Sequence, residues 1–408
     1  MPLEGIRVVD LTIFWAGPLP TAIMADFGAE VIKVEAANRF DPFRVLVTPG
    51  DPSKVFELSA CFNSTNRNKL GLTLDLTNAE GRRLFIELVR KSDVLVQNFS
   101  PRVMPQLGLD YETLRKINPA LVMTSVSGFG QDGPWRDYVS FAAIGEALSG
   151  ITGLTGYTGE GALCHGVGVS DPFAGYMAAF ATIAAVMRAR ETGRGQHVDC
   201  SQLESSIQYI ADAIMDFSLN GRVLTRGTND DPALAPHGCF PARGDDQWLT
   251  LSVGNVEQWH ALVETMGHPA WASEERFATP LMRHRNREVL NALVAQWTAR
   301  HDKFELTKNL QSRGVPAAPA LMPSEQLKDP QLSATGYYQS VDHRFAGRHP
   351  YQSLPVRFDG AYPPIRRVGP TLGQDNREVL TRILGLGDAE IARLEAAEII
   401  GTQPTGKV

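Results

Sequence analysis

One acidic residue is a candidate for chemistry: Asp171, which lies where an apolar stretch gives way to a predicted helix start. Asp followed by Pro172 is typical of a helix N-terminus. The carboxylate can accept hydrogen bonds from the N–H groups of the first turn, and the N–H that proline lacks would have no partner within the helix at this position. The helix dipole is expected to keep this carboxylate ionised at neutral pH. Asp171 therefore either caps the helix or reacts, and the local sequence alone favours capping.

The helix that follows Asp171 is apolar on nearly every side from Phe173 to Met187, so we expect it to be buried in a core. The charged residues Arg188 and Arg190 predict that the last turn of this helix is exposed to solvent, and Gly193 is expected to end it.

The elements that must position this helix alternate between strand and helix through the N-terminal third. Short runs rich in β-branched residues predict strands at 6–11, 31–34, 70–76, 93–96 and 121–126. Predicted helices begin at Gly17 and Pro18, at a capping box of Thr77 with Glu80, and at about Tyr111. This alternation predicts an α/β fold with a doubly wound, mostly parallel sheet. Ligands bind at the carboxyl ends of such strands, so the loops after 11, 34, 76, 96 and 126 are the candidate binding loops.

The segment GFGQDG at 128–133 matches the letters of a dinucleotide-binding motif. However, Pro134 and Trp135 follow where the helix of that motif should begin. We interpret the segment as a glycine-rich turn that lets backbone approach a neighbour closely, not as an NAD site. A second capping box, Ser201 with Glu204, predicts a helix that reaches about Asn220.

The composition changes after Gly221. Residues 1–222 are assigned to the large domain, and the polar, proline-containing stretch 223–236 is predicted to be a linker. Residues 237–330 are predicted to form a small α+β domain, with a hairpin of strands 239–242 and 247–253 followed by helices at 256–266, 285–299 and 304–312. The remaining stretch 331–408 is predicted to return to the large domain and form its C-terminal part, with two more helices at 377–384 and 389–398.

Composition narrows the class of partner. The 408 residues are 43% hydrophobic and 21% charged with a net charge of −6, and the charges are interspersed, which argues against nucleic acid and membrane partners and favours small molecules. The opening MPLEGIRVVDL lacks signal-peptide character, and no uncharged apolar run reaches the ~18 residues of a membrane span, so we expect a cytoplasmic protein. Four cysteines without CxxC spacing and nine histidines without HxxxH spacing predict neither disulfides nor a metal site.

Ordered motifs along essentially the whole chain carry a family resemblance. They are GIRVVDLT followed by AGP, DFGAEVIKVE, NRNKLGLTLDL, VLVQNFSPR, SGFGQDGP, the Asp171 stretch with TGRGQHVD, PHGCFPARGDDQW and GVPAAP. In this order they resemble the class III coenzyme A-transferase family, which includes formyl-CoA transferase and the carnitine CoA-transferases. The resemblance implies a large Rossmann-like domain built from both ends of the chain, a smaller central domain and an interlocked homodimer.

The resemblance also reverses the interpretation of Asp171, since the family nucleophile is an aspartate at this position. By similarity, Asp171 attacks an acyl-CoA thioester to give a mixed anhydride and free CoA thiolate. The thiolate then forms an aspartyl-CoA thioester and releases the donor acid, and an acceptor acid runs both steps in reverse. Only a carboxylate can become an acid derivative in this way. Acyl-CoA would be a substrate, and no permanently bound cofactor is implied.

CoA contacts are carried over to the positions that match the family motifs. Family members often carry Arg after KVE, where this chain has Ala36. His237 is a weak candidate for substrate contact. The CoA candidates are Phe14 and Trp15 after the first strand, Leu74 in the third, Asn98 and Phe99 after the fourth, and, for the phosphates, Arg44 and Arg102.

Two other functions stay open. Alpha-methylacyl-CoA racemases share the fold but use a His–Asp pair, whereas the corresponding loop here, DYVSFAAIGEALSG, has Phe141 near the expected His and contains no histidine. A non-catalytic acyl-CoA-binding protein would not need Asp171. The acids that exchange CoA are not identified by the sequence.

Overall fold

The computed structural model describes residues 1–46, 55–227 and 229–405, which fall into two compact units. Unit 1 is formed by residues 1–153, 163–224 and 333–408, and unit 2 by residues 154–162 and 225–332. Unit 1 therefore contains both ends of the chain.

Unit 1 is built on a six-stranded sheet in the order β3-β2-β1-β4-β5-β6, and every neighbouring pair is parallel. The predicted α/β fold with a parallel, doubly wound sheet is confirmed, although the edge strand β6 was not predicted. The strands are β1 (Arg7–Leu11), β2 (Glu30–Glu35), β3 (Lys69–Thr73), β4 (Val94–Gln97), β5 (Val122–Ser127) and β6 (His197–Ser201).

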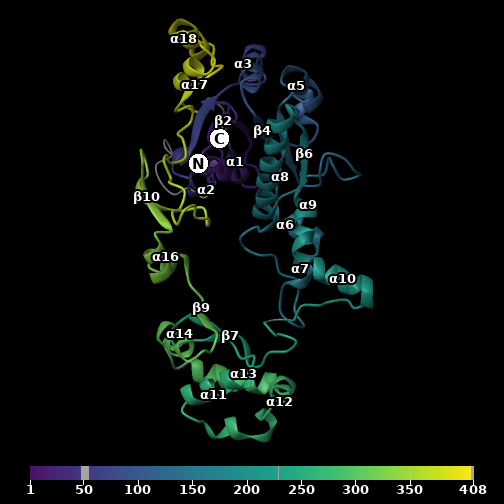
Figure 1. Cartoon of the computed structure of the whole chain (residues 1–408), viewed down its shortest axis with the longest axis vertical. Helices are drawn as coiled ribbons and strands as arrows, with labels where there is room; N and C mark the ends of the chain where they lie inside the picture. Colours follow the sequence, from purple (N-terminus) through teal and green to yellow (C-terminus); the bar gives the residue numbers. More distant parts are fainter. Residues whose placement is uncertain (47–54, 228, 406–408) are drawn as a thin grey trace. The chain divides into compact units, whose positions relative to one another are not determined.

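Helices cover both faces of the sheet (Figure 1). Successive residues of a strand point to opposite faces. Val8 packs on the side of α1 (Pro18–Asp26) and α8 (Ser170–Thr192), and Val9 packs on the side of α3 (Ala79–Arg90). The second side is completed by α5 (Tyr111–Ile117), α17 (Asn376–Arg382) and α18 (Asp388–Ala396).

The capping box predicted at the start of α3 is wrong by one residue. Asn78 caps this helix, and its side-chain oxygen accepts from the backbone N–H of Glu80 at 2.8 Å. Thr77 is not available because its hydroxyl donates to Asp75.

Strand order reverses at β1, because the chain proceeds from β1 to β2 on one side and later returns to β4 on the other. Such a reversal opens a crevice at the carboxyl ends of the two strands, where α/β folds bind ligands. The loops at this crevice are residues 12–17 after β1 and residues 98–102 after β4.

Helix α8 runs for 23 residues and ends at Gly193, whose φ of 68° is left-handed. The expectation that it is buried all round is wrong. One face packs on α1, α9 (Gln202–Ile207) and strands β5 and β6, while Tyr176, Phe180 and Met187 are 52%, 72% and 62% exposed. By length and composition α8 is able to cross a membrane, but here it is a covering layer of the sheet.

The glycine-rich segment after β5 forms a turn, as predicted. Gly130 and Gly133 have φ values of 87° and 80°. A Cβ on Gly128 would lie 2.4 Å from the Cβ of Ser140, so only glycine permits this approach.

Unit 2 has a three-stranded antiparallel sheet in the order β7-β8-β9, with the predicted hairpin as its first two strands. Its core contains Trp259, Phe277 and Leu290. The elements are β7 (His237–Pro241), β8 (Trp248–Ser252), β9 (Ala317–Pro319), α11 (Val256–Thr265), α12 (Pro280–Arg285), α13 (Arg287–Thr298), α14 (Lys303–Ser312), α15 (Pro323–Gln326) and α16 (Pro330–Thr335), the last of which crosses the unit boundary.

The C-terminal segment of unit 1 seals the edge strand β3. Asp375 accepts from the N–H of Gly71 at 2.7 Å, and Asn376 accepts from that of Thr73 at 2.8 Å, so these edge donors are satisfied. The other helices and strands of this unit are α2 (Ala60–Thr65), α4 (Val103–Leu107), α6 (Ala142–Ser149), α10 (Ala211–Asn220), β10 (Tyr338–His343) and β11 (Gly347–Gln352), together with α7 (Ile151–Leu154), which crosses the unit boundary.

Candidate active site

Asp171 is the second residue of α8, and its carboxylate is held at one oxygen. The side-chain amide of Gln202 donates to Asp171 Oδ1 at 2.5 Å. Among the described residues, Asp171 Oδ2 has no hydrogen-bond partner and is not sealed from solvent. The helix begins at Ser170, and Asp171 makes no capping hydrogen bond to it. The carboxylate is therefore anchored on one side and open on the other.

Burial raises the pKa of the Asp171 carboxyl from 3.8 to about 6. The hydrogen bond from Gln202 opposes this rise, and the negative charge of Glu146 adds to it. Desolvation is therefore the largest influence on this carboxyl, but it does not raise the pKa to neutral pH. At pH 7 the carboxylate is still ionised by roughly ten to one, which leaves it able to act as a nucleophile.

Glu146 of α6 fixes the loop that leads into α8. It is fully buried, and its two oxygens accept from the backbone N–H groups of Val169 at 2.8 Å and His165 at 3.1 Å. The imidazole of His165 lies 3.4 Å from the same carboxylate. Glu146 thus sets the direction in which the chain enters the helix that carries Asp171.

Close packing joins α6 and α8 at the same point. A Cβ on Gly145 would lie 3.0 Å from Ser170 Oγ, which itself donates to the carbonyl of Ala142. One turn after Asp171, a Cβ on Gly175 would meet Leu19 of α1 at 2.8 Å. Small residues therefore bring α1, α6 and α8 together around the Asp171 carboxylate.

The loop after β1 is held across the strand-order reversal by Asn98. The amide of Asn98 donates to the carbonyl of Ile13 and accepts from its N–H, both at 2.8 Å. Phe14 follows with a φ of 63°, an uncommon conformation for a residue other than glycine. Its N–H donates to Asp41 Oδ1 at 2.9 Å, and Asp41 is held in turn by the buried Lys33. These contacts fix the strained loop at the edge of the sheet where α/β folds bind ligands.

An aromatic contact links this loop to the neighbourhood of Asp171. The ring of Phe14 packs edge-on against Phe141, the residue before α6, with centroids 6.1 Å apart. Trp15 is half-buried in the same loop, and its carbonyl accepts from Leu19 at the start of α1. Phe14, Trp15 and Asn98 are therefore brought together at one edge of unit 1.

Two of the predicted CoA contacts have other roles in this structure. Arg44 is fully buried and bonds Glu35, Glu57 and the carbonyl of Pro370, so its charge is paired inside the protein. Leu74 is 1% exposed and packs in the core. The sequence did not reveal these roles, because an Arg in a loop and a Leu in a strand look alike whether or not a ligand meets them.

The other predicted residues are distributed over both units. Phe99 is partly buried against the sheet core, and its N–H donates to Gln97. Arg102 precedes α4 and is exposed; its backbone carbonyl accepts from the N–H of Gln106 at 3.1 Å, and its side chain makes no hydrogen bond within the described ranges. His237 lies in unit 2, where its Nδ1 is 2.7 Å from Ser252 Oγ.

Gln202 and Glu146 were missed by the sequence analysis. Gln202 lies inside the correctly predicted cap of α9, where Ser201 accepts from the N–H of Glu204. No pattern distinguishes it from an ordinary first-turn residue. Glu146 did carry a signal: a lone carboxylate in the apolar run AAIGEAL must be paired when the helix is buried.

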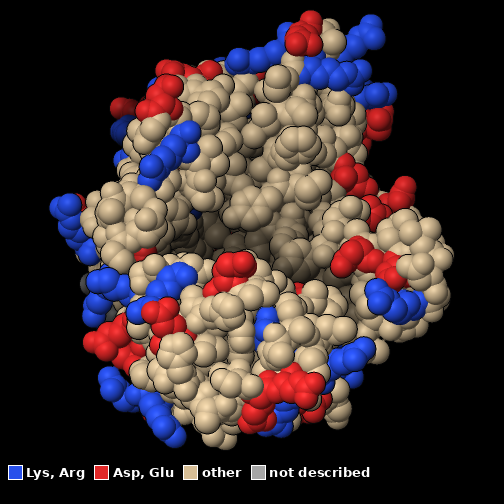
Figure 2. Space-filling view, turned by 60° about the horizontal axis from the view of Figure 1, so that its bottom comes forward, with Lys and Arg blue, Asp and Glu red and all other residues tan. Residues whose placement is uncertain are grey.

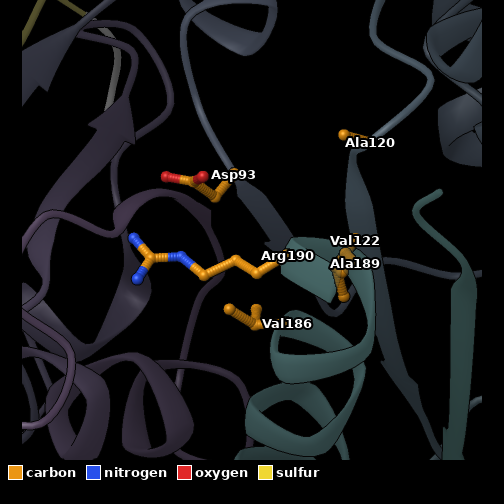
Figure 3. A pocket seen from close by; sticks show the side chains of 6 residues that line it. All are labelled: Asp93, Ala120, Val122, Val186, Ala189 and Arg190. Carbon is orange, nitrogen blue, oxygen red and sulfur yellow. The ribbon is translucent and has the colours of Figure 1, made fainter. Parts of the chain in front are cut away.

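A separate cavity of about 140 Å³ lies at the opposite end of α8 (Figure 3). It is lined by Asp93, Ala120, Val122, Val186, Ala189 and Arg190, and the Arg190 side chain extends toward Asp93. The two ends of a helix of this length are ~30 Å apart, so this cavity is not part of the Asp171 site.

On the face shown in Figure 2, basic and acidic side chains are mixed and neither forms a continuous patch. Within residues 1–46, 55–227 and 229–405 there is no cluster of three or more His, Cys, Asp and Glu side chains arranged to hold a metal ion.

Comparison with known proteins decides the family. The sequence profile described as CoA-transferase family III matches residues 3–376. The chain belongs to this family. It is 33% identical over 399 residues to the succinyl-CoA–D-citramalate CoA-transferase of Chloroflexus aurantiacus, covering 98% of each chain. It is also 33% identical over 384 residues to the succinate–glutarate CoA-transferase of Agrobacterium fabrum, covering 94% of this chain and 96% of that one.

A solved structure agrees with this assignment. The crystal structure of a CaiB/BaiF family protein from Brucella suis superposes with a TM-score of 0.87 at 31% identity, covering 94% of this chain and 99% of that one. The resemblance to the class III CoA-transferases is confirmed, and the protein is an enzyme of the CoA-transferase class that acts on CoA thioesters.

Proposed function

We propose that this enzyme moves CoA from an acyl-CoA to a free carboxylic acid, with Asp171 as the nucleophile. The observation that carries the proposal is the asymmetry of the Asp171 carboxylate, because Oδ1 is anchored by Gln202 while Oδ2 has no partner among the described residues. An open, ionised oxygen on a fixed carboxylate suits attack on a thioester carbonyl.

The reaction then proceeds through the Asp171 carboxyl in balanced steps. Oδ2 attacks the thioester carbonyl, the C–S bond breaks, and a mixed anhydride and CoA thiolate result. The thiolate attacks Cγ of Asp171, which gives an aspartyl-CoA thioester and releases the donor acid with Oδ2 as one of its oxygens. The acceptor carboxylate attacks the same Cγ, the C–S bond breaks, and a second mixed anhydride and CoA thiolate result. The thiolate then attacks the acceptor acyl carbon, its bond to the bridging oxygen breaks, and formation of the new thioester leaves Asp171 as a free carboxylate that has kept one acceptor oxygen. Water must be excluded throughout, because both intermediates hydrolyse readily.

The CoA moiety is proposed to lie at the strand-order reversal, near Phe14, Trp15, Asn98 and Phe99. Support comes from the fixed loop after β1 and from its packing against the start of α6. Arg102 remains the candidate for phosphate contact, since it is exposed and its charge is not paired within the described residues. His237 is proposed as a substrate contact on the weaker ground of sequence similarity alone. No permanently bound cofactor is proposed.

We further propose a cytoplasmic, interlocked homodimer in which the predicted linker 223–236 connects the large domain to the small domain, 237–330. Support for self-association comes from large apolar side chains left exposed on α8 and α10. Phe180 and Leu219 are each 72% exposed and Phe217 is 59% exposed. Apolar surface on this scale is typical of an interface between subunits.

A transfer assay tests the function and separates it from the alternatives. Both named relatives carry succinate or succinyl in their names, so succinyl-CoA is the first donor to try, followed by acetyl-CoA, against a panel of mono- and dicarboxylic acids. We expect acceptor-dependent formation of a new thioester that Asp171→Asn abolishes. Exchange of the α-hydrogen without transfer would indicate a racemase, and binding without either reaction would indicate an acyl-CoA-binding protein.

A further inference from the structure

We propose that Gln202 is a catalytic residue whose side-chain amide stabilises the oxyanion formed on Asp171 itself. This inference rests on the proposed function and extends it, because it assigns a donor to two of the reaction's tetrahedral states. It concerns the aspartyl carbonyl, not the carbonyl of the acyl group.

The first argument is chemical. An ionised carboxylate only accepts hydrogen bonds, so the group of Gln202 that faces Asp171 must be the NH2 group, and the 2.5 Å distance is that of Nε2 to Oδ1. When Oδ2 forms the anhydride, Oδ1 becomes the carbonyl oxygen of the aspartyl group. The amide that anchored the carboxylate is then already directed at the oxygen that will carry negative charge.

The charge on this oxygen develops twice in each transfer. When CoA thiolate attacks Cγ of Asp171, a C–S bond forms and the electron pair of the C=O bond moves to Oδ1. The bond from Cγ to the bridging oxygen then breaks, and the donor acid leaves. Attack of the acceptor carboxylate on the aspartyl thioester places charge on Oδ1 again. A donor aimed at this oxygen before the reaction needs no reorganisation during it.

The second argument is structural, since Gln202 is held in place by its helix. It is the first residue of α9, directly after β6, and only 9% of it is exposed. Its carbonyl accepts from Ser206 Oγ at 2.8 Å, while Ser201 caps the helix by accepting from Glu204 N–H. Helices α8 and α9 pack against each other, so the amide and Asp171 are fixed on two rigid elements.

The test compares Gln202→Met, which keeps side-chain length and burial, with Ser205→Ala one turn away on α9. The Ser205 hydroxyl donates to the carbonyl of Ser201, lies 3.7 Å from Cys200 Sγ and makes no hydrogen bond to Asp171, so its removal reports damage to the start of α9 and its contact with β6. Each variant is mixed with succinyl-CoA and no acceptor, and formation of the aspartyl-CoA adduct on Asp171 is followed by quenched-flow mass spectrometry. Acetyl-CoA replaces succinyl-CoA if the wild type does not accept it.

For Gln202→Met we expect adduct formation and its discharge by acceptor to slow by about 10²–10³-fold, as for loss of one oxyanion donor. The KM for acyl-CoA should change little. The acid limb of the pH–rate profile should move above its wild-type position, because the Gln202 hydrogen bond lowers the pKa of Asp171. Ser205→Ala should match the wild type in all three measurements.

Two outcomes would overturn the inference while leaving the proposed function intact. One is an adduct that forms on Gln202→Met as fast as on the wild type. The other is a slow variant whose whole defect is the shifted acid limb and disappears at high pH, which would make Gln202 a pKa-setting residue only. In contrast, absence of any adduct on the wild type together with transfer by Asp171→Asn would show that the proposed nucleophile itself is wrong.

Discussion

Replacing Asp171 by Asn is expected to stabilise the folded protein while it abolishes transfer. Burial raises the pKa of this carboxyl from 3.8 to about 6, so the folded state holds the proton more tightly than the unfolded chain does. Each pKa unit corresponds to ~1.36 kcal/mol, so the ionised side chain costs the folded state at most about 3 kcal/mol at pH 8. The amide of Asn carries no charge, and its oxygen still accepts from Gln202.

The sign of the pH dependence follows from the direction of the shift. A carboxyl whose folded pKa is raised favours folding fully only below its unfolded pKa of 3.8, and this contribution is lost as pH rises through about 6. The stability difference between Asp171→Asn and the wild type should therefore be under about 1 kcal/mol near pH 4 and should reach its maximum above pH 7.

Unfolding curves in urea at several pH values measure this difference. Asp132→Asn is the control, because it makes the same side-chain change at an exposed carboxylate of the same unit. A gap for Asp171→Asn that is constant across pH would refute the reasoning. So would an Asn variant less stable than the wild type at pH 8, since the carboxylate would then be stabilised by its surroundings.

Three further predictions concern the residues around the site. Glu146→Gln leaves one side-chain oxygen to accept from two backbone donors, so it should lower the free energy of unfolding in urea by about 1–3 kcal/mol. Because the negative charge of Glu146 raises the pKa of Asp171, its removal should move the acid limb of the pH–rate profile to lower pH, and a move to higher pH would contradict this charge effect. Asn98→Ala removes the hydrogen-bond partners of the backbone N–H and C=O of Ile13 and should raise the KM for acyl-CoA by about 10-fold, with a smaller effect on kcat, in steady-state kinetics. An unchanged KM would show that the loop after β1 does not contribute to CoA binding. Arg44→Met removes one partner of a buried ion-pair network and should destabilise the protein by about 3–5 kcal/mol, whereas a stable variant with a raised KM would restore Arg44 as a ligand contact.

Much of the fold was predictable because it depends on local patterns. Alternating strand and helix signals predicted five of the six strands of the sheet, and the predicted helix start at about Tyr111 is where α5 begins. Strand β6 was missed because HVDCS is short and polar at its start, and only pairing with β5 makes it a strand. The exposed face of α8 was missed for a related reason: an apolar helix sequence does not show which of its faces packs on the sheet and which lies at the surface of unit 1.

The site was predictable only where a single residue carried the signal. Asp171 stood out because Asp-Pro marks a helix start, but the tertiary structure gives its carboxylate a partner, Gln202, from another helix and another charge, Glu146, from a third. Neither relation follows from sequence spacing, since the three residues are separated by 25 and 31 positions along the chain. Arg44 shows the reverse case, where a residue chosen for its charge proved to be neutralised inside the core.

The fate of oxygen atoms tests the central claim most directly. The acceptor acid is labelled with heavy oxygen in its carboxylate, the enzyme is allowed a single turnover, and the peptide that contains Asp171 is analysed by mass spectrometry. Transfer through an aspartyl anhydride predicts that the Asp171 carboxyl gains one heavy oxygen from the acceptor. Product formed with no heavy oxygen in that peptide would mean that CoA passes between the two acids without covalent participation of Asp171, and Asp171 would then not be the nucleophile.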